Sequence, residues 1–461
     1  MEKPMRFLEY AVIAAVFLLA LHDAIAMYYL GGANWDFIAH WLYAKSLINP
    51  AFYSALFSGR LAAATLYANS FYFETLRAPL TGIMMVPFAM IGKPAIPAYF
   101  AFALLLLLAS SLYVSRQLDT KASTLPLILL TPYAAFFLLL LNGTEIVTMS
   151  ILLVFVAFLL RKSWKAGIIL GIAGLAKYPS LIFVLLLVLL PAGQRRKAFL
   201  AFVLVTLPWL AFNAVAFHNP VFSYIVSANS FSQGNTAGYF PIGVISQSLW
   251  LTLPELIPAL AVATALIALA GGKRSGFIDA ARKDYRYRVL LVFLAVGLLA
   301  WLIIAVRGSI NDLPRLGYLV YGGCALLLAT AISDVSKARR RAYAYCLAAL
   351  FISMAAISIT WFPYSGFRFY GSSNAALSSS ENAISAQGLS NCNIVSNNWV
   401  YLIYLGYRAH FPYYYNYTIQ HYPVVYFTAL GSNNTAVNLA NITRKTEYNG
   451  FFVALPRDYT C

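Results

Sequence analysis

The chain has 461 residues, of which 61% are hydrophobic and 10% are charged, and its formal net charge is +17. Repeated apolar runs of span length exclude a soluble globular protein and predict a polytopic α-helical membrane protein. Much of the positive charge lies in short blocks between these runs, at 161–165, 195–197, 273–288 and 337–341. Such blocks are typical of cytoplasmic loops and of contact with anionic lipid headgroups, and they do not indicate a nucleic-acid partner.

The predicted spans, in chain order, are 8–30, 79–92, 96–115, 124–141, 146–160, the broken pair 166–176 and 178–192, then 199–217, 254–271, 289–306, 316–333 and 344–361. The basic blocks leave the loops 31–78, 218–253 and 307–315 and the segment 362–461 outside. An outside loop at 31–78 and an inside block at 161–165 require an odd number of crossings, yet four apolar segments lie between them. Either 79–92, about 21 Å long as a helix, or 124–141 therefore does not span. We expect about 11 crossings, with a cytoplasmic N-terminus and an extracytoplasmic C-terminal segment.

The first outer loop, 31–78, begins with a candidate catalytic base. Asp36 follows the first span directly, in a chain that has only 15 acidic residues, so its carboxylate is either solvated or used. His40 and Tyr43 lie one and two helical turns further on, which predicts a short amphipathic helix on the outer surface with its polar face toward a cavity. The alternative for Asp36 is a helix N-cap in an interfacial loop.

Three more ionisable residues lie near the predicted outer surface. Arg77 ends the same loop, Glu145 heads the span 146–160, and Lys177 separates the two halves of the broken pair. For Glu145, capping at the positive end of a helix dipole and a second acidic site are both open. The sequence predicts two short helices that meet at the outer side, with Lys177 at the break, where it either faces a cavity or extends to the headgroups.

The short outer loop 307–315 contains Arg307, Asp312 and Arg315, whereas the other outer loops are mostly neutral. The planar fork of an arginine matches phosphate oxygens, so this loop is the first choice for contact with a lipid phosphate. Anchoring to ordinary headgroups is the alternative.

Residues 362–461 have no apolar run of span length and are rich in Ser, Asn and Tyr. Short strands at 393–397, 423–427 and 451–455 and a helix at 399–409 predict a small α/β domain. Sequons at Asn416, Asn433 and Asn441 fit an exterior location. Cys392 and Cys461 would form a disulfide there, provided that their Cα atoms lie close enough.

These features together resemble the GT-C superfamily of integral-membrane glycosyltransferases, and within it the mannosyltransferases that use polyprenol-phosphomannose. The matching parts are Asn34-Trp35-Asp36-Phe37 after the first span, Arg77-Ala78-Pro79-Leu80, Asn142-Gly143-Thr144-Glu145 at the head of a span, Lys177-Tyr178-Pro179, and the exterior C-terminus. The chain departs from oligosaccharyltransferases, because it lacks a WWDYG stretch, and the first loop has no DxD. The resemblance implies an all-α polytopic membrane bundle of GT-C type (1–361) followed by a small extracytoplasmic α/β domain (362–461).

The resemblance also implies an inverting glycosyltransferase that moves a sugar, mannose or another hexose, from a polyprenyl-phosphate donor to an extracytoplasmic lipid, glycan or protein acceptor. Asp36 would deprotonate the acceptor hydroxyl, while cations stabilise the leaving phosphate. The expected substrate-binding residues are His40, Tyr43, Arg77, Glu145, Lys177, Arg307, Asp312 and Arg315. A divalent cation shared by Asp36 and Glu145 would add metal assistance, and no nucleotide-binding signature is present.

Two other classes of protein remain open. A transporter or flippase for polyisoprenoid lipids would use the same charged residues to line a translocation path. A membrane scaffold would bind a partner through its exterior domain.

Overall fold

The computed structural model describes residues 2–31, 35–57, 77–120, 124–130, 144–225, 227, 284–306, 317–338, 381–382, 384–395, 399–410, 424–427, 442–448 and 451–456. The chain forms two compact units. Unit 1 comprises Met1–Ala26, Thr75–Met84 and Ile91–Phe362, and unit 2 comprises Met27–Glu74, Met85–Met90 and Pro363–Cys461. The exterior segment predicted to begin at 362 thus corresponds to the last part of unit 2, which begins at Pro363. The predicted outer loop 31–78 falls mostly in unit 2, which contains residues up to Glu74.

Three described helices are long and apolar enough to cross a membrane, namely Lys93–Gln117, Ala192–Phe217 and Tyr285–Ile304. They are compatible with membrane insertion, as the composition predicts. Shorter apolar helices among the described residues are Tyr10–His22, Pro79–Ile91, Glu145–Leu160, Lys165–Ala176, Tyr178–Leu189 and Tyr318–Asp334. The predicted spans 254–271 and 344–361, and most of 124–141, lie outside the described residues.

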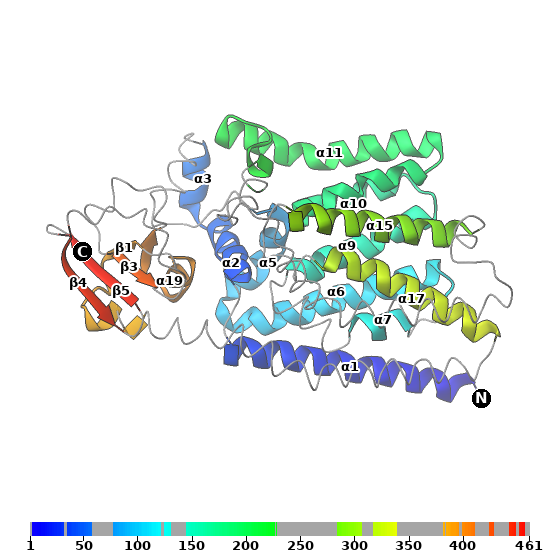
Figure 1. Cartoon of the computed structure of the whole chain (residues 1–461), viewed down its shortest axis with the longest axis horizontal. Helices are drawn as coiled ribbons and strands as arrows, with labels where there is room; N and C mark the ends of the chain where they lie inside the picture. The colour runs from blue at the N-terminus through cyan, green and yellow to red at the C-terminus, as the bar shows by residue number, and fades with distance from the viewer. Residues whose placement is uncertain are drawn as a thin grey trace. The chain divides into compact units, whose positions relative to one another are not determined.

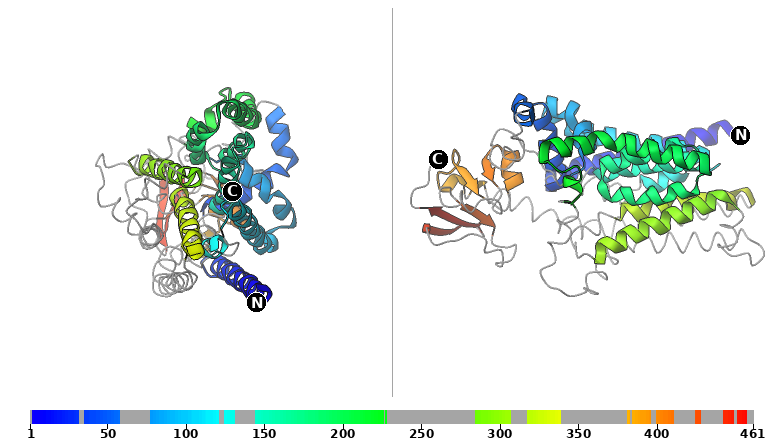
Figure 2. Two further views of the ribbon diagram at one scale, coloured as in Figure 1. Left: turned by 90° about the vertical axis from the view of Figure 1, so that its right-hand side faces the viewer. Right: turned by 90° about the horizontal axis from the view of Figure 1, so that it is seen from above.

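The long helices of unit 1 lie side by side along one common direction (Figure 1), and the views in Figure 2 show the same bundle from its end and from above. The helical segments from the N-terminus through unit 1 are α1 (Glu2–Gly31), α5 (Pro79–Ile91), η1 (Lys93–Ala95), α6 (Ile96–Gln117), α7 (Thr124–Leu129), α9 (Thr144–Leu160), α10 (Lys165–Ala176), η3 (Tyr178–Leu189), α11 (Ala192–Phe217), α15 (Tyr285–Val306) and α17 (Tyr318–Ala338). Helix α9 contacts α6, α10, α15, α17 and η3, so it forms the core. Its side chains after Glu145 carry no charge, and a helix that is apolar on all faces is most stable when it is buried on all faces.

A glycine allows α10 and α11 to approach each other closely. A Cβ atom built on Gly167 of α10 would lie 1.8 Å from the carbonyl oxygen of Ala198 in α11. The obstacle is backbone, which cannot rotate aside as a side chain can. The spacing between α10 and α11 therefore depends on the missing side chain at Gly167.

We expect Gly167→Ala to lower the free energy of unfolding by about 1–3 kcal/mol, because the extra methyl group forces α10 and α11 apart. The measurement is the thermal unfolding temperature of the purified protein in detergent. Gly193→Ala is the matched control, because no atom lies within 4 Å of the position of its Cβ. Equal unfolding temperatures for the two variants would contradict the close contact.

The break predicted at Lys177 is confirmed, but the segment that follows it differs from a standard helix. Residues Tyr178–Leu189 form a 3₁₀ helix rather than an α-helix. At about 2.0 Å per residue, its 12 residues extend about 24 Å, whereas the 12 residues of α10 extend about 18 Å as an α-helix. The tighter winding therefore lets a short apolar segment reach further through the bundle.

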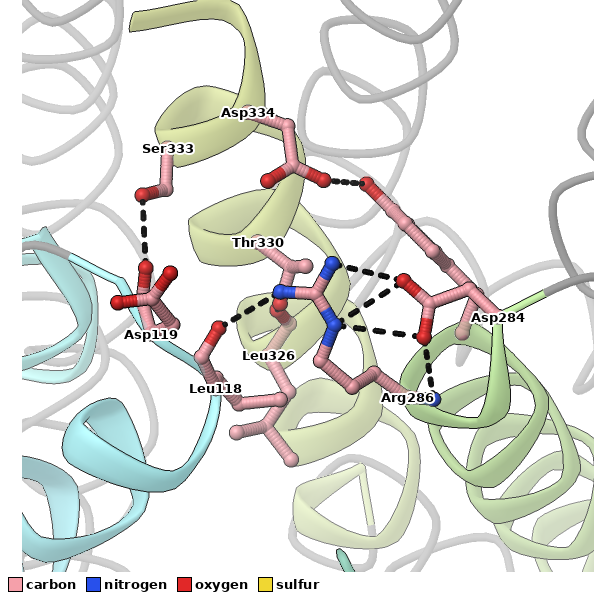
Figure 3. Close-up of polar contacts among 9 residues, drawn as sticks. Leu118, Asp119, Asp284, Arg286, Leu326, Thr330, Ser333 and Asp334 are labelled. Carbon is pink, nitrogen blue, oxygen red and sulfur yellow. Dashed lines mark hydrogen bonds and ion pairs between the residues drawn. The ribbon is translucent and has the colours of Figure 1, made fainter. Parts of the chain in front are cut away.

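Four consecutive residues at the start of α15, Asp284 to Tyr287, tie together one end of the bundle. The Arg286 guanidinium donates to both carboxylate oxygens of Asp284 and, at 3.1 Å, to the carbonyl oxygen of Leu118 after α6 (Figure 3). Tyr287 donates to Asp334 of α17 at 2.8 Å. We call Asp284–Tyr287 the clasp, because it joins the ends of three helices.

Tyr285 extends the clasp to two more segments. Its hydroxyl donates at 3.1 Å to the carbonyl oxygen of Leu159 in α9 and lies 3.5 Å from that of Leu189 in η3. The ends of α6, α9, η3 and α17 therefore meet around the first residues of α15. The opposite end of the bundle contains Glu145 and Lys177, at the other ends of α9 and η3.

The clasp predicts a specific pH dependence of stability. Partial burial raises the pKa of Asp284, but the hydrogen bonds and the charge of Arg286 outweigh burial and leave the pKa below its ordinary value. A lowered pKa in the folded state stabilises the fold above the unfolded pKa, and this stabilisation is lost as the pH falls through the folded value. We therefore expect Asp284→Asn to lower the unfolding temperature at pH 7 and to leave it nearly unchanged at a second pH below the lowered folded-state pKa, where the Asp284 carboxyl is protonated in both the folded and the unfolded protein. Thermal unfolding at both pH values is the measurement, and an equal loss at both would contradict the role of the charge.

Unit 2 contains a five-stranded sheet with strand order β2-β1-β3-β5-β4. Strand β1 pairs in parallel with β2 and β3, whereas β5 pairs antiparallel with β3 and β4. The strands are β1 (Asn393–Val395), β2 (Arg408–His410), β3 (Val424–Phe427), β4 (Ile442–Tyr448) and β5 (Phe451–Pro456), and the helices are α2 (Trp35–Leu47), α3 (Pro50–Phe57) and α19 (Trp399–Leu405). Strands β1, β3 and β5 coincide with the three predicted segments, and β2 and β4 are additional.

The predicted helix 399–409 is shorter than expected. Gly406 has φ +103°, a backbone conformation that favours glycine and ends α19. The Tyr407 and Gly406 amides donate to the carbonyl oxygens of Leu402 and Ile403, which is the Schellman pattern of hydrogen bonds. The chain can then turn into β2.

Candidate functional site

The candidate site lies at the break between α10 and η3. Lys177 has an extended backbone (φ −159°, ψ 121°) between the two helices, and Pro179 in the first turn of η3 has no amide hydrogen with which to continue α10. The Lys177 ammonium donates to the Glu145 carboxylate as an ion pair. The Glu145 side chain is completely buried, and that of Lys177 is 15% exposed. Each charge therefore stabilises the other where an isolated charge would be costly.

Residues of α17 and η3 complete the surroundings of Lys177. The Tyr318 ring centroid lies 5.8 Å from the Lys177 Nζ atom, within range of a cation–π contact. The Tyr318 hydroxyl forms a 3.3 Å hydrogen bond with the Ser180 hydroxyl. Lys177 therefore lies between a carboxylate and an aromatic face, both supplied by other segments.

The residue after the break connects it to Arg77. The Tyr178 hydroxyl donates to the Arg77 carbonyl oxygen at 3.2 Å and accepts from the Trp209 indole at 3.0 Å. Thr81 donates to the carbonyl oxygen of Ala176 at 3.4 Å. Three predicted site residues from distant parts of the sequence thus lie around the break: Glu145 and Lys177 with their side chains, and Arg77 with its backbone carbonyl. We call Arg77, Glu145, Lys177, Tyr178 and Tyr318 the break cluster.

Several residues near the break were not predicted from the sequence. Tyr178 packs against Tyr224 with ring centroids 4.5 Å apart, and Trp209 stacks on Phe212 at 4.9 Å. For Tyr318, the one feature of the sequence that could have indicated a site residue is its position directly after the loop 307–315. Aromatic residues are so frequent in this chain, with 32 Tyr and 32 Phe, that spacing alone could not single these out.

The structure corrects the prediction for the helix that carries His40 and Tyr43. Residues 37–44 of α2 are all buried, and His40 and Tyr43 are only 5% and 8% exposed. The predicted surface position of this helix is therefore wrong for residues 37–44: α2 belongs to the core of unit 2, where it packs against α19. The cavity predicted along its polar face stays a prediction. Burial raises the pKa of the Tyr43 phenol, which keeps it protonated.

Asp36 occupies the first turn of α2, the position expected for a residue near a helix start. The contacts of its carboxylate lie outside what the structure describes. Its roles as base and as N-cap therefore both stay predictions. Arg307, Asp312 and Arg315 also lie outside the described residues.

The structure describes some, but not all, of the residues predicted to form a disulfide and to hold a metal ion. Cys392 is buried and disulfide-bonded, and Cys461, its predicted partner, lies outside the described residues. Within the described ranges, no group of three or more His, Cys, Asp or Glu side chains could hold a metal ion. A divalent cation shared by Asp36 and Glu145 stays a prediction.

No family model matches this chain, and neither a curated protein nor a solved structure matches it.

Proposed function

We propose that this protein is an inverting membrane glycosyltransferase of GT-C type, which moves a hexose from a polyprenyl-phosphate donor to an extracytoplasmic acceptor. The observation that supports this most is the buried Lys177–Glu145 ion pair at a helix break. The next residue, Tyr178, donates to the backbone carbonyl of Arg77. Ionisable groups within membrane segments are costly and are usually functional. A donor with a phosphate at the membrane surface requires cations held in this kind of position.

In the proposed reaction, the Asp36 carboxylate removes the proton from an acceptor hydroxyl. The hydroxyl oxygen attacks the anomeric carbon while the bond from that carbon to the lipid phosphate breaks, so the configuration inverts. Lys177, Arg77 and the arginines of the loop 307–315 stabilise the phosphate as it leaves. Glu145 orients Lys177 in this scheme and provides a negative charge next to it in the absence of substrate.

The topology that we propose follows from the clasp. Arg286 bonds to Leu118 and Ser333 to Asp119, so the end of α6 lies beside segments that the basic blocks assign to the inside. Helix α6 then crosses from outside to inside. With this direction, the crossings can be counted correctly only if α5 is the apolar segment that does not span the membrane. The segment 124–141 must then span it.

We further propose that unit 2 is the extracytoplasmic domain, of α/β type. The mixed sheet and α19 support the fold, and the disulfide-bonded Cys392 supports an oxidising compartment. The sequons of the same segment support an exterior position but add little alone.

The test is sugar transfer in vitro by the purified protein in lipid vesicles, with a synthetic radiolabelled polyprenyl-phosphate hexose and a mixture of glycan and glycolipid acceptors. Transfer by the parent and its loss in Asp36→Asn support the proposal. Donor that crosses the bilayer without hydrolysis or transfer, in parent and variant alike, would instead indicate the transporter or flippase.

A further inference from the structure

Six basic residues gather at the end of the bundle away from the break cluster. Arg161, Lys162 and Lys165 lie at the turn between α9 and α10, and Arg195, Arg196 and Lys197 lie in the first turns of α11. All six are exposed. The two segments are adjacent, because the Trp164 amide donates to the Gln194 side chain at 3.1 Å. We call these six residues the basic patch.

No carboxylate neutralises the basic patch in the part of the chain that the structure describes. Arg161 donates to the Tyr113 hydroxyl at 3.1 Å, Lys162 lies 4.9 Å from the centre of the Tyr285 ring, and Arg195 donates to the carbonyl oxygen of Val188 at 2.8 Å. These partners orient the cations but carry no negative charge. Arg286, in contrast, is paired with Asp284.

An exposed apolar surface begins immediately after the basic patch. Phe199, Leu200 and Leu204 of α11 are 55%, 60% and 56% exposed. They belong to a helix that is long and apolar enough to cross a membrane. Cations followed along one helix by exposed apolar side chains match a ligand with an anionic head and apolar tails.

We propose that the basic patch is a binding site for an anionic phospholipid, with the headgroup phosphate on the cations and the acyl chains along Phe199, Leu200 and Leu204. Exposed basic residues attract anionic headgroups, and the uncompensated charge selects such lipids over zwitterionic ones. The proposal does not depend on the proposed transfer reaction.

The experiment uses the full-length protein in zwitterionic detergent micelles, titrated with phosphatidylglycerol or phosphatidylcholine and followed by native mass spectrometry and thermal unfolding. We expect the parent to prefer phosphatidylglycerol. Salt at about 0.5 M should reduce that preference strongly, because it screens exposed charges. The variant Arg196→Gln/Lys197→Gln should weaken phosphatidylglycerol binding about tenfold to thirtyfold, at a factor of about five per charge.

The matched control is Lys45→Gln/Arg408→Gln, which removes two exposed cations from unit 2 and should leave the preference unchanged. Glycerol phosphate without acyl chains should not compete at millimolar concentration. A parent with no lipid preference, an equal loss in both double variants, or full competition by glycerol phosphate would each overturn the proposal. The salt titration of the parent needs no variant, so the test stands even if a variant fails to fold.

Discussion

Asp36→Asn is expected to reduce sugar transfer by a factor on the order of 10² to 10⁴, which is the usual effect of removing a positioned general base. An amide has nearly the shape of a carboxylate but cannot accept the hydroxyl proton. Donor binding should survive, because the phosphate is held by cations elsewhere in the proposed site. The measurement is initial rate at saturating donor, with binding of the polyprenyl-phosphate sugar followed separately.

The control for this variant is Glu381→Gln, which removes another carboxylate from unit 2 outside the proposed site. It should transfer sugar at the parent rate. If Asp36→Asn has the same rate as the parent, while both variants unfold at the parent temperature, then Asp36 is not the base. A lower unfolding temperature of Asp36→Ala, with that of Asp36→Asn unchanged, would instead favour the N-cap role, because asparagine caps a helix as well as aspartate does and losing a cap costs about 0.5–2 kcal/mol.

The second large effect is expected for stability rather than for rate. Glu145→Gln should lower the free energy of unfolding by about 3–5 kcal/mol, because it removes the negative charge that pairs with the mostly buried Lys177 ammonium. The measurement is thermal unfolding in detergent at pH 7. Tyr318→Phe is the control: it keeps the ring near Lys177 and loses the hydrogen bond to Ser180, which is worth about 0.5–1.5 kcal/mol.

The double variant Glu145→Gln/Lys177→Met separates stability from function. Replacing both charges removes the uncompensated ammonium, so most of the lost stability should return. Transfer should stay low in this variant if Lys177 stabilises the leaving phosphate. A stable double variant with the parent rate would remove Lys177 from the proposed site while leaving the structural account of the ion pair intact.

Some features of this protein follow directly from local sequence. The apolar runs define apolar helices, three of which are compatible with membrane insertion, and a lysine followed by Tyr-Pro in such a run interrupts the helix, as the structure shows at Lys177. The strand segments β1, β3 and β5 were readable from short β-branched and aromatic runs. In each case the signal lies within a few residues of the element that it specifies.

The mistaken expectation for α2 had a tertiary cause. Asp36, His40 and Tyr43 recur at helical spacing, which normally indicates an exposed polar face. The faces of α2 are buried by segments far away in the chain, including α19, and no local pattern reveals that contact. Periodicity reports the chemistry of a helix face, whereas burial depends on what packs against it.

The sequence by itself determined which segments are apolar, where they break and which residues carry charge. Only the tertiary structure decided which charges meet. Glu145 and Lys177 are 32 residues apart, yet they pair because α9 and η3 place their ends together. Asp284 neutralises Arg286, whereas no carboxylate among the described residues neutralises the basic patch. Such pairing depends on the packing of whole helices, and electrostatic interactions depend on distances in space that linear spacing does not contain.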